Sequence, residues 1–261
     1  MTQGSTTFWQ KRWDRLVALT NQFGDKLLKV IDQGIAKQSV IPTTPFLDPA
    51  TFPWTREIEA NWSTIRAELD TVLARLDALP NFQDISTDQY NLTDDDQWKT
   101  FFLYGYGFRS DANCRRCTAT DRLVRTIPGM QTAMFSIFAP HKRIPHHDGP
   151  YKGVVRYHLG LRVPQDPTLA GIRVGPDTAH WTEGGSLVFD DTYDHEAWND
   201  SDEVRVVLFV DFVRPLRQPM KTFNAVVLKA IGYSPFIQDA KRRHEEWERR
   251  YAELEAGRGL V

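Results

Sequence analysis

The segment GVVRYHLGLRV, residues Gly153–Val163, has the length and composition of a β-strand. It is rich in β-branched and aromatic residues and is bounded by a glycine and a proline. Side chains of an extended strand alternate between two faces, so Arg156 and His158 share one face with Val154 and Gly160. That face is either the inside of a barrel, where an anionic ligand would offset the cost of burying the arginine, or a face exposed to solvent.

Five other segments have the same character. They are Trp98–Tyr106, Gln131–Phe138, Gly171–Val174, Gly185–Phe189 and Val204–Val213. All are short and are separated by Gly, Pro or Asp, which are residues typical of turns. Six such strands predict an all-β sandwich or barrel.

The sequence before this β region predicts helices. In Arg56–Asp77 the apolar residues recur every three or four positions, which indicates one continuous amphipathic helix. A less regular apolar stripe runs from Trp9 to Ile31, and we expect it to pack on the domain rather than lie on a membrane surface. Four prolines in Ile41–Pro53 predict an extended connection.

The region after the strands is helical again, with mixed charges over Ile237–Ala256 that are typical of a solvated helix face. We therefore expect a single domain over residues 1–261. It would have a helical part at 1–80, a β core at 90–215 and a helical tail at 220–261.

The composition indicates a water-soluble globular protein, with 41% hydrophobic and 25% charged residues and a net charge of −2. This charge gives no reason to expect nucleic acid as a partner. We see neither a signal peptide nor an apolar run long enough to span a bilayer, so we expect a cytoplasmic protein. The pair Cys114 and Cys117 has no second CxxC or histidine near it in sequence, which favours two free thiols in a loop.

Histidines and an arginine are the candidate functional residues. His147 belongs to the turn-like segment PHHDGP, residues 145–150, and His195 lies between two predicted strands. Two histidines at a barrel rim could bind a metal such as iron(II). Arg205 lies in the apolar strand Val204–Val213, where its planar guanidinium needs a carboxylate partner, either internal or from a bound dicarboxylate.

Three stretches of the chain make it similar to a known family. They are HDGPYKGVVRYHLGL (His147–Leu161), FDDTYDHEAWN (Phe189–Asn199) and VRVVLFVDFVRP (Val204–Pro215). Together they resemble the aspartyl/asparaginyl β-hydroxylase family over roughly residues 90–215. The resemblance implies a double-stranded β-helix (jelly-roll) barrel that is mainly β with flanking helices. It also implies a dioxygenase that uses Fe(II), 2-oxoglutarate and O2.

The resemblance also implies roles for six residues. His147 and His195 match the metal-binding histidines, and Arg205 matches the arginine that binds the distal carboxylate of 2-oxoglutarate, with Ser136 assisting. Two further residues match positions near the other carboxylate end of the cosubstrate. They are Arg156 and His158.

The third metal ligand is left open by the sequence. Many enzymes of this chemistry use a His-x-Asp pair with a distal histidine. Here Gly149, not a carboxylate, follows His147 by two positions, whereas a one-residue shift would pair His146 with Asp148. We expect His147 to be the ligand. Asp190 and Asp191 are expected either to orient ligands or to cap a turn.

Three functions fit these residues. β-Hydroxylation of Asp or Asn in a peptide or small molecule is the first expectation. A lipid acyl hydroxylase of the lipid A type and a non-catalytic metal and dicarboxylate sensor are the alternatives. Three basic residues lie near the predicted mouth of the barrel, namely Lys142, Arg143 and Lys152. They would either attract an acidic substrate or be ordinary exposed charges. The oligomeric state is not indicated.

Overall fold

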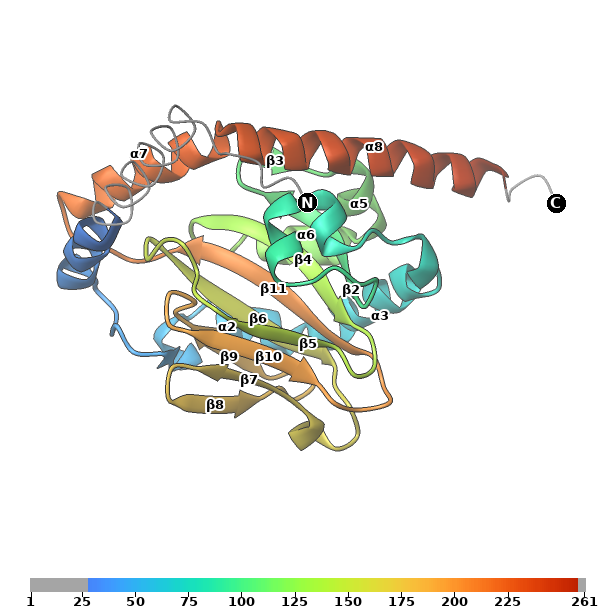
Figure 1. Cartoon of the computed structure of the whole chain (residues 1–261), viewed down its shortest axis with the longest axis horizontal. Coiled ribbons are helices and arrows are strands. Elements are labelled where there is room, and N and C mark those ends of the chain that lie inside the picture. The colour runs from blue at the N-terminus through green and yellow to red at the C-terminus, as the bar shows by residue number, and fades with distance from the viewer. Residues whose placement is uncertain (1–27, 258–261) are drawn as a thin grey trace, which may run out of the picture.

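The computed structural model describes residues 28–257 of the chain. Two antiparallel sheets face each other, and helices cover the outer face of the larger sheet (Figure 1). In spatial order the large sheet consists of β1 (Phe46–Leu47), β9 (Ser186–Phe189), β6 (Val154–Arg162), β11 (Arg205–Val213), β4 (Met130–Phe138), β2 (Trp98–Gly105) and β3 (Phe108–Arg109). The small sheet consists of β5 (Arg143–His147), β10 (His195–Asn199), β7 (Ala170–Val174) and β8 (Asp177–His180).

From β4 onward the chain passes back and forth between the sheets. Strands β4, β6, β9 and β11 belong to the large sheet, while β5, β7, β8 and β10 belong to the small one. All strand pairs in both sheets are antiparallel. This alternation is the double-stranded β-helix, or jelly roll, that the sequence predicted.

Helices flank the large sheet. They are residues 28–38, α2 (Thr55–Ala60), α3 (Trp62–Leu73), α4 (Phe82–Ile85), α5 (Asp111–Arg116), α6 (Thr118–Val124), α7 (Met220–Gly232) and α8 (Pro235–Gly257). Within residues 28–257, four short 3-10 turns accompany them. They are η1 (Pro49–Thr51), η2 (Leu76–Ala78), η3 (Thr87–Asn91) and η4 (Pro167–Leu169).

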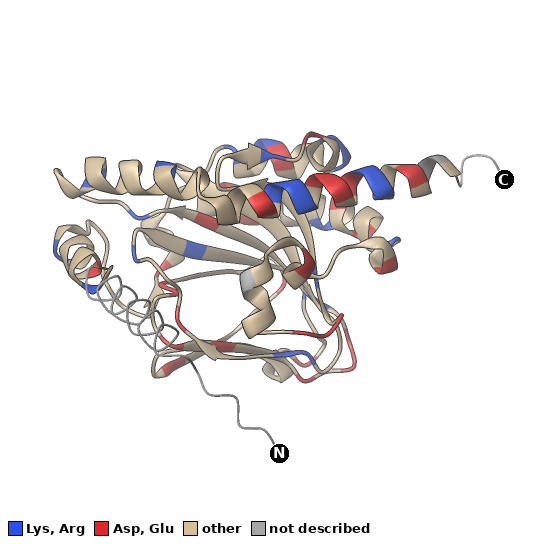
Figure 2. Ribbon diagram, turned by 45° about the horizontal axis from the view of Figure 1, so that its top comes forward, with Lys and Arg blue, Asp and Glu red and all other residues tan. Residues whose placement is uncertain are grey.

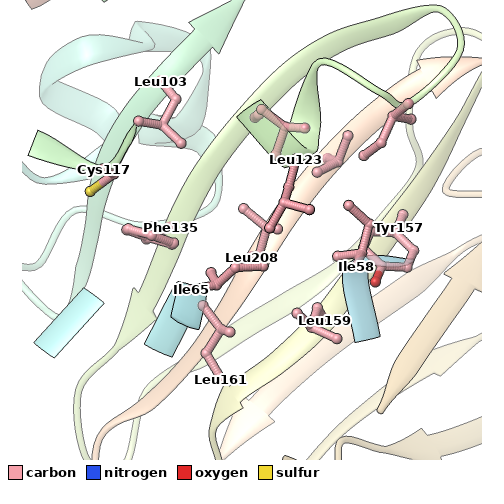
Figure 3. Packing of buried hydrophobic residues seen from close by; sticks show 14 of the residues in the cluster. Ile58, Ile65, Leu103, Cys117, Leu123, Phe135, Tyr157, Leu159, Leu161 and Leu208 are labelled. Atoms are coloured by element: carbon pink, nitrogen blue, oxygen red, sulfur yellow. The ribbon is translucent and has the colours of Figure 1, made fainter. Parts of the chain in front are cut away.

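The outer face of the large sheet forms the main hydrophobic core. Ile58 of α2 and Ile65 of α3 pack against outward-facing residues of the central strands, such as Leu159 and Leu208 (Figure 3). The other face of the same strands looks into the space between the two sheets, where a second cluster includes Met134, Phe189 and Phe209. Strand alternation therefore divides each central strand into a core side and an interior side.

Several sequence expectations need correction. The predicted helix Arg56–Asp77 is broken at Asn61, whose φ and ψ of −107° and 11° are not helical. Residues 145–147 of the predicted turn-like segment 145–150 belong to strand β5, and His195 begins β10 rather than lying in a loop. Strand β5 is an edge strand, where a proline such as Pro145 is tolerated, and this explains why its sequence does not look like a strand.

The two cysteines were wrongly expected in a loop. Cys114 lies in α5 and Cys117 directly follows it. Both are free thiols in the main core, and burial raises their pKa values. The apolar stripe from Trp9 to Ile31 lies mostly outside the described residues, as do residues 258–261 of the tail.

Candidate active site

His147 and His195 face each other at one end of the interior. His147 ends β5 and His195 begins the adjacent strand β10, and the two residues are direct cross-strand partners. Their ring centroids are 4.1 Å apart. The sheet therefore brings two imidazoles from distant parts of the sequence to one point, the barrel mouth.

Both imidazoles are held in the form that binds metals. The Nδ1 atom of His147 lies 2.9 Å from the carbonyl oxygen of Pro145, and that of His195 lies 2.9 Å from the carbonyl oxygen of Tyr193. A carbonyl only accepts hydrogen bonds, so each Nδ1 carries the proton and each Nε2 offers a lone pair. Burial lowers both pKa values, that of His195 to about 4, so both rings are neutral at pH 7.

The alternative pair of metal ligands, His146 and Asp148, is not placed beside His195 in this way. His146 is exposed and pairs with the carboxylate of Asp194 at 3.3 Å, and Asp148 is exposed as well. Within residues 28–257, no group of three or more His, Cys, Asp or Glu side chains is arranged to hold a metal ion. The described residues thus offer a pair of histidines without a third protein ligand.

Gly149 and Asp191 explain why no carboxylate follows His147. A Cβ atom at Gly149 would lie only 2.6 Å from the carboxyl carbon of Asp191. The Gly149 amide also donates to the backbone carbonyl of Asp191 at 2.7 Å. Asp191 is buried beside the histidine pair, and its Oδ1 has no hydrogen-bond partner. Asp191 therefore fills the space that a side chain at position 149 would need.

Arg156 is paired with internal carboxylates. Its guanidinium lies 2.9 Å from Asp191 and 2.9 Å from Asp211, which is its cross-strand partner on β11. The guanidinium also covers the ring of Phe209. Internal carboxylates therefore offset the cost of burying this arginine, where the sequence left an anionic ligand or solvent as alternatives. The expectation that Arg156 lies near the cosubstrate stays a prediction.

Arg205 differs, because nothing in the described chain pairs with its Nε and Nη1 atoms. The side chain is buried, and its guanidinium lies between the rings of Phe138 at 3.6 Å and Trp181 at 4.5 Å. Burial lowers its pKa, yet the group stays protonated at neutral pH. A buried and unpaired cation is costly, which makes the surrounding space a site for an anion.

Other polar atoms in this interior also lack partners. They are both ring nitrogens of His158, the indole Nε1 of Trp181 and Oγ1 of Thr100. His158 packs against Trp181, Phe189 and Phe209, and burial lowers its pKa well below the usual value. The predicted interior face of β6 is therefore the one that carries His158.

Ser136 lies on the same interior as Arg205. Its side chain shares a face of β4 with Phe138, the residue that Arg205 covers, and its Oγ accepts a hydrogen bond from Trp98 Nε1 at 3.1 Å. The serine hydroxyl can still donate to a ligand. Ser136 and Arg205 thus both lie on the interior side of the large sheet, on the adjacent strands β4 and β11.

Sequence reasoning missed three of these residues. Asp211 could have been found, because alternation along β11 places it on the same face as Arg205. Trp181 and Thr100 carry no pattern that would assign them to the interior. Their position follows from the packing of the two sheets alone.

The basic residues predicted near the mouth are already paired. Lys142 is buried and binds Asp95 at 2.7 Å. Lys152 binds Asp190 at 2.6 Å, and Arg143 binds Asp200. Asp190 also binds Arg214, so it holds a loop together rather than a ligand. The expectation that Lys142, Arg143 and Lys152 attract an acidic substrate is not supported.

Comparison with known proteins identifies the family of the chain. A profile described as Aspartyl/Asparaginyl beta-hydroxylase matches residues 59–215. The fold and the match together define a jelly-roll hydroxylase. The chain belongs to the aspartyl/asparaginyl β-hydroxylase family.

Relatives of known name differ in how much of the chain they match. An ornithine lipid ester-linked acyl 2-hydroxylase from Rhizobium tropici is 50% identical over 85% of this chain and 79% of its own length. A human aspartyl/asparaginyl beta-hydroxylase is 30% identical over 64% of this chain, but the match spans only 22% of the human protein. Among solved structures, a Pseudomonas putida prolyl-4-hydroxylase matches 59% of this chain and 87% of its own, at 17% identity and a TM-score of 0.40.

No helix within residues 28–257 is both long and apolar enough to cross a bilayer.

Proposed function

We propose that the protein hydroxylates carbon 2 of a lipid acyl chain, with iron(II) as cofactor and with 2-oxoglutarate and O2 as cosubstrates. One observation carries the choice of substrate. The R. tropici ornithine lipid hydroxylase shares 50% of residues over most of both chains. The similarity to the human aspartyl/asparaginyl hydroxylase is lower and shorter. The lipid alternative is therefore preferred to the first expectation from sequence, an Asp or Asn substrate.

The site is compatible with this preference. The mouth cations that would have favoured an acidic peptide are bound to internal carboxylates. The lack of a side chain at Gly149 follows from the closeness of Asp191 and does not discriminate between the substrates.

The chain's own residues suit the proposed cofactors. His147 and His195 would hold the iron through their free Nε2 atoms, and Arg205 would bind the distal carboxylate of 2-oxoglutarate with help from Ser136. Bound iron, with 2-oxoglutarate and O2, replaces C–H by C–OH and releases succinate and CO2. The aromatic rings around Arg205 exclude water from the carboxylate, which strengthens the ion pair.

Asp191 and Arg156 would act at the mouth rather than on 2-oxoglutarate. Arg156 fixes one carboxylate oxygen of Asp191, so that the unpartnered Oδ1 stays beside the histidine pair. Such an oxygen can accept a hydrogen bond from a water bound to the metal. This would compensate for the missing third protein ligand.

The test is a substrate comparison with the iron-loaded protein. Ornithine lipid, other acyl lipids and Asp-containing peptides are each supplied with 2-oxoglutarate, and succinate release is measured above the uncoupled background. We expect stimulation by the lipid and a product heavier by one oxygen, located at carbon 2 of the acyl chain by fragmentation. Stimulation by peptides alone would favour Asp or Asn hydroxylation. Binding of metal and 2-oxoglutarate without any turnover would favour the sensor.

A further inference from the structure

Helix α7 is apolar on two opposite faces, and only one of them packs on the protein. The inner face contributes Leu228 and Ile231 to a cluster with Ile35 of the 28–38 helix. The outer face carries Phe223, Val226, Ala230 and Tyr233, spaced by three and four residues, so that they form one stripe. Phe223, Val226 and Tyr233 are 41%, 63% and 73% exposed. A helix apolar all round is expected inside a protein or at a membrane, not in water.

The charge around this stripe is of one sign. No Asp or Glu occurs from Phe212 to Gln238, whereas Arg217, Lys221 and Lys229 are all exposed. In Figure 2, α7 shows no red and only occasional blue, whereas α8 alternates red and blue along its length. Helix α8 therefore has the surface of an ordinary solvated helix. Helix α7 combines apolar and basic residues, the combination that binds anionic lipid surfaces.

The helix lies at the barrel mouth. Asn224 on its inner face accepts a hydrogen bond from Tyr151 at 2.7 Å and donates to the carbonyl of Gly153 at 2.8 Å. Both partners belong to the segment that connects His147 to β6. Strand β11 runs from Arg205 toward α7, and the blue 28–38 helix lies next to α7 (Figure 1).

A cavity of about 490 Å³ lies between α7, the start of α8 and the β2–β3 turn. Its walls include Tyr106, Phe108, Leu228, Lys229 and Ile237. The charges of Asp211, Arg156 and Asp191 act on the phenol of Tyr106, although burial has the largest effect in raising its pKa. Tyr106, in the cavity wall, is therefore within electrostatic reach of the charged residues of the mouth. Its volume is within the range of small-ligand sites.

We propose that the outer face of α7, with Phe236 of α8, docks on a bilayer surface that contains anionic lipids. Docking would place the mouth and the adjoining cavity over the acyl region. The apolar stripe would enter the headgroup boundary, and Lys221 and Lys229 would contact anionic headgroups. The choice of a bilayer as occupant follows from the exposed apolar stripe and the absence of acidic residues. The link to catalysis rests on the lipid substrate proposed above.

Vesicle sedimentation of the full chain tests the docking. Vesicles of phosphatidylcholine alone are compared with an equal mixture of phosphatidylcholine and phosphatidylglycerol. The variant Phe223→Ser/Val226→Ser/Tyr233→Ser should bind the mixed vesicles at least about tenfold more weakly, because three exposed apolar side chains no longer enter the boundary. Lys221→Gln and Lys229→Gln should each weaken binding by about fivefold on mixed vesicles and change nothing on phosphatidylcholine.

The matched control changes three other exposed apolar residues away from α7, Tyr90→Ser/Leu169→Ser/Leu254→Ser, which are 53%, 40% and 54% exposed. This variant should bind as the unchanged chain does. Equal binding by the α7 variant and the unchanged chain would overturn the proposal. So would a dimer in the ultracentrifuge that the α7 substitutions turn into a monomer, since the stripe would then be an interface between copies.

A water-soluble short-chain ornithine lipid separates this proposal from the proposed function. The variant Phe223→Ser/Val226→Ser, which keeps Tyr233 in the cavity wall, should hydroxylate it at the unchanged rate and lose turnover only on vesicles. Hydroxylation of the soluble lipid by a chain that does not bind vesicles would contradict docking alone. Vesicle binding without hydroxylation of any lipid would contradict the proposed function alone.

Discussion

The two ends of the barrel interior hold two arginines in opposite situations, Arg156 partly buried and Arg205 fully buried. At the mouth, Arg156 pairs with Asp191 and Asp211, and the two histidines nearby are neutral. At the floor, Arg205 lies between two aromatic rings, and its Nε and Nη1 atoms have no partner. Both side chains come from adjacent strands of one sheet, so burial alone does not explain the difference.

This contrast separates structural from ligand-binding charge. A buried charge with internal partners contributes to folding, because removing it leaves those partners unpaired. A buried charge without partners destabilises the protein until a ligand arrives, and its retention needs a functional reason. Arg156 belongs to the first kind and Arg205 to the second. Substitutions at the two ends should therefore move stability and ligand binding in different directions.

The largest effect is expected for the histidines of the mouth. His147→Ala or His195→Ala should lower iron(II) affinity by at least about 100-fold, because even changes to residues that only orient ligands cost 10–100-fold. Metal analysis of the purified variants measures this. His146→Ala is the matched control, since its ring points to Asp194. Loss of metal in His146→Ala with full retention in His147→Ala would restore the His146-x-Asp148 register.

Arg156→Met should lower the free energy of unfolding by about 3–5 kcal/mol, because Asp191 and Asp211 would remain buried without their cation. Denaturant unfolding of the apo protein measures this. Adding Asp211→Asn should recover part of the loss, since one of the two carboxylates is then neutral. A loss below about 1 kcal/mol in Arg156→Met would mean that the ion pairs contribute little and that the contrast with Arg205 is smaller than the contacts indicate.

Arg205→Met should leave the apo protein as stable as before, or more stable, while 2-oxoglutarate binding is lost. Arg205→Lys keeps the charge without the planar fork and should weaken binding by about 1–3 kcal/mol. Anaerobic calorimetry gives the affinities, and denaturant unfolding of the apo protein gives the stability. An Arg205→Met protein that unfolds more easily but binds 2-oxoglutarate normally would show that the arginine is structural.

Much of the large sheet could be predicted from sequence, because its central strands bury both faces and read as apolar runs. Segments such as Val204–Val213 match β11 to within one residue. The small sheet was harder. Strands β5 and β10 contain Pro, His, Glu and Asn, since they lie at or near a sheet edge and carry the functional side chains.

The candidate site was predictable only in part, for a physical reason. The resemblance selected His147, His195 and Arg205, but partners across strands depend on register, which one sequence does not specify. That is why the sequence left an anionic ligand or solvent as the surroundings of Arg156, although Asp211 stands opposite it. It is also why the Lys142 ammonium was expected at the surface although it is buried against Asp95.

The smallest effect is expected for the indole N–H group of Trp181, which lies beside Arg205 at the floor of the barrel interior. Trp181→Phe keeps a ring beside the Arg205 guanidinium but removes the indole Nε1, which has no partner in the apo protein. If that group donates to the bound carboxylate, 2-oxoglutarate affinity should fall by about 0.5–1.5 kcal/mol, while apo stability changes little.

Trp98→Phe is the matched control, because its Nε1 already donates to Ser136. That variant loses an internal hydrogen bond and should lower apo stability by about 1 kcal/mol. Calorimetry and denaturant unfolding of both variants compare the two tryptophans. A Trp181→Phe protein with unchanged affinity and lowered stability would place Trp181 with the internally paired groups and would confine the ligand-binding charge at the floor to Arg205 itself.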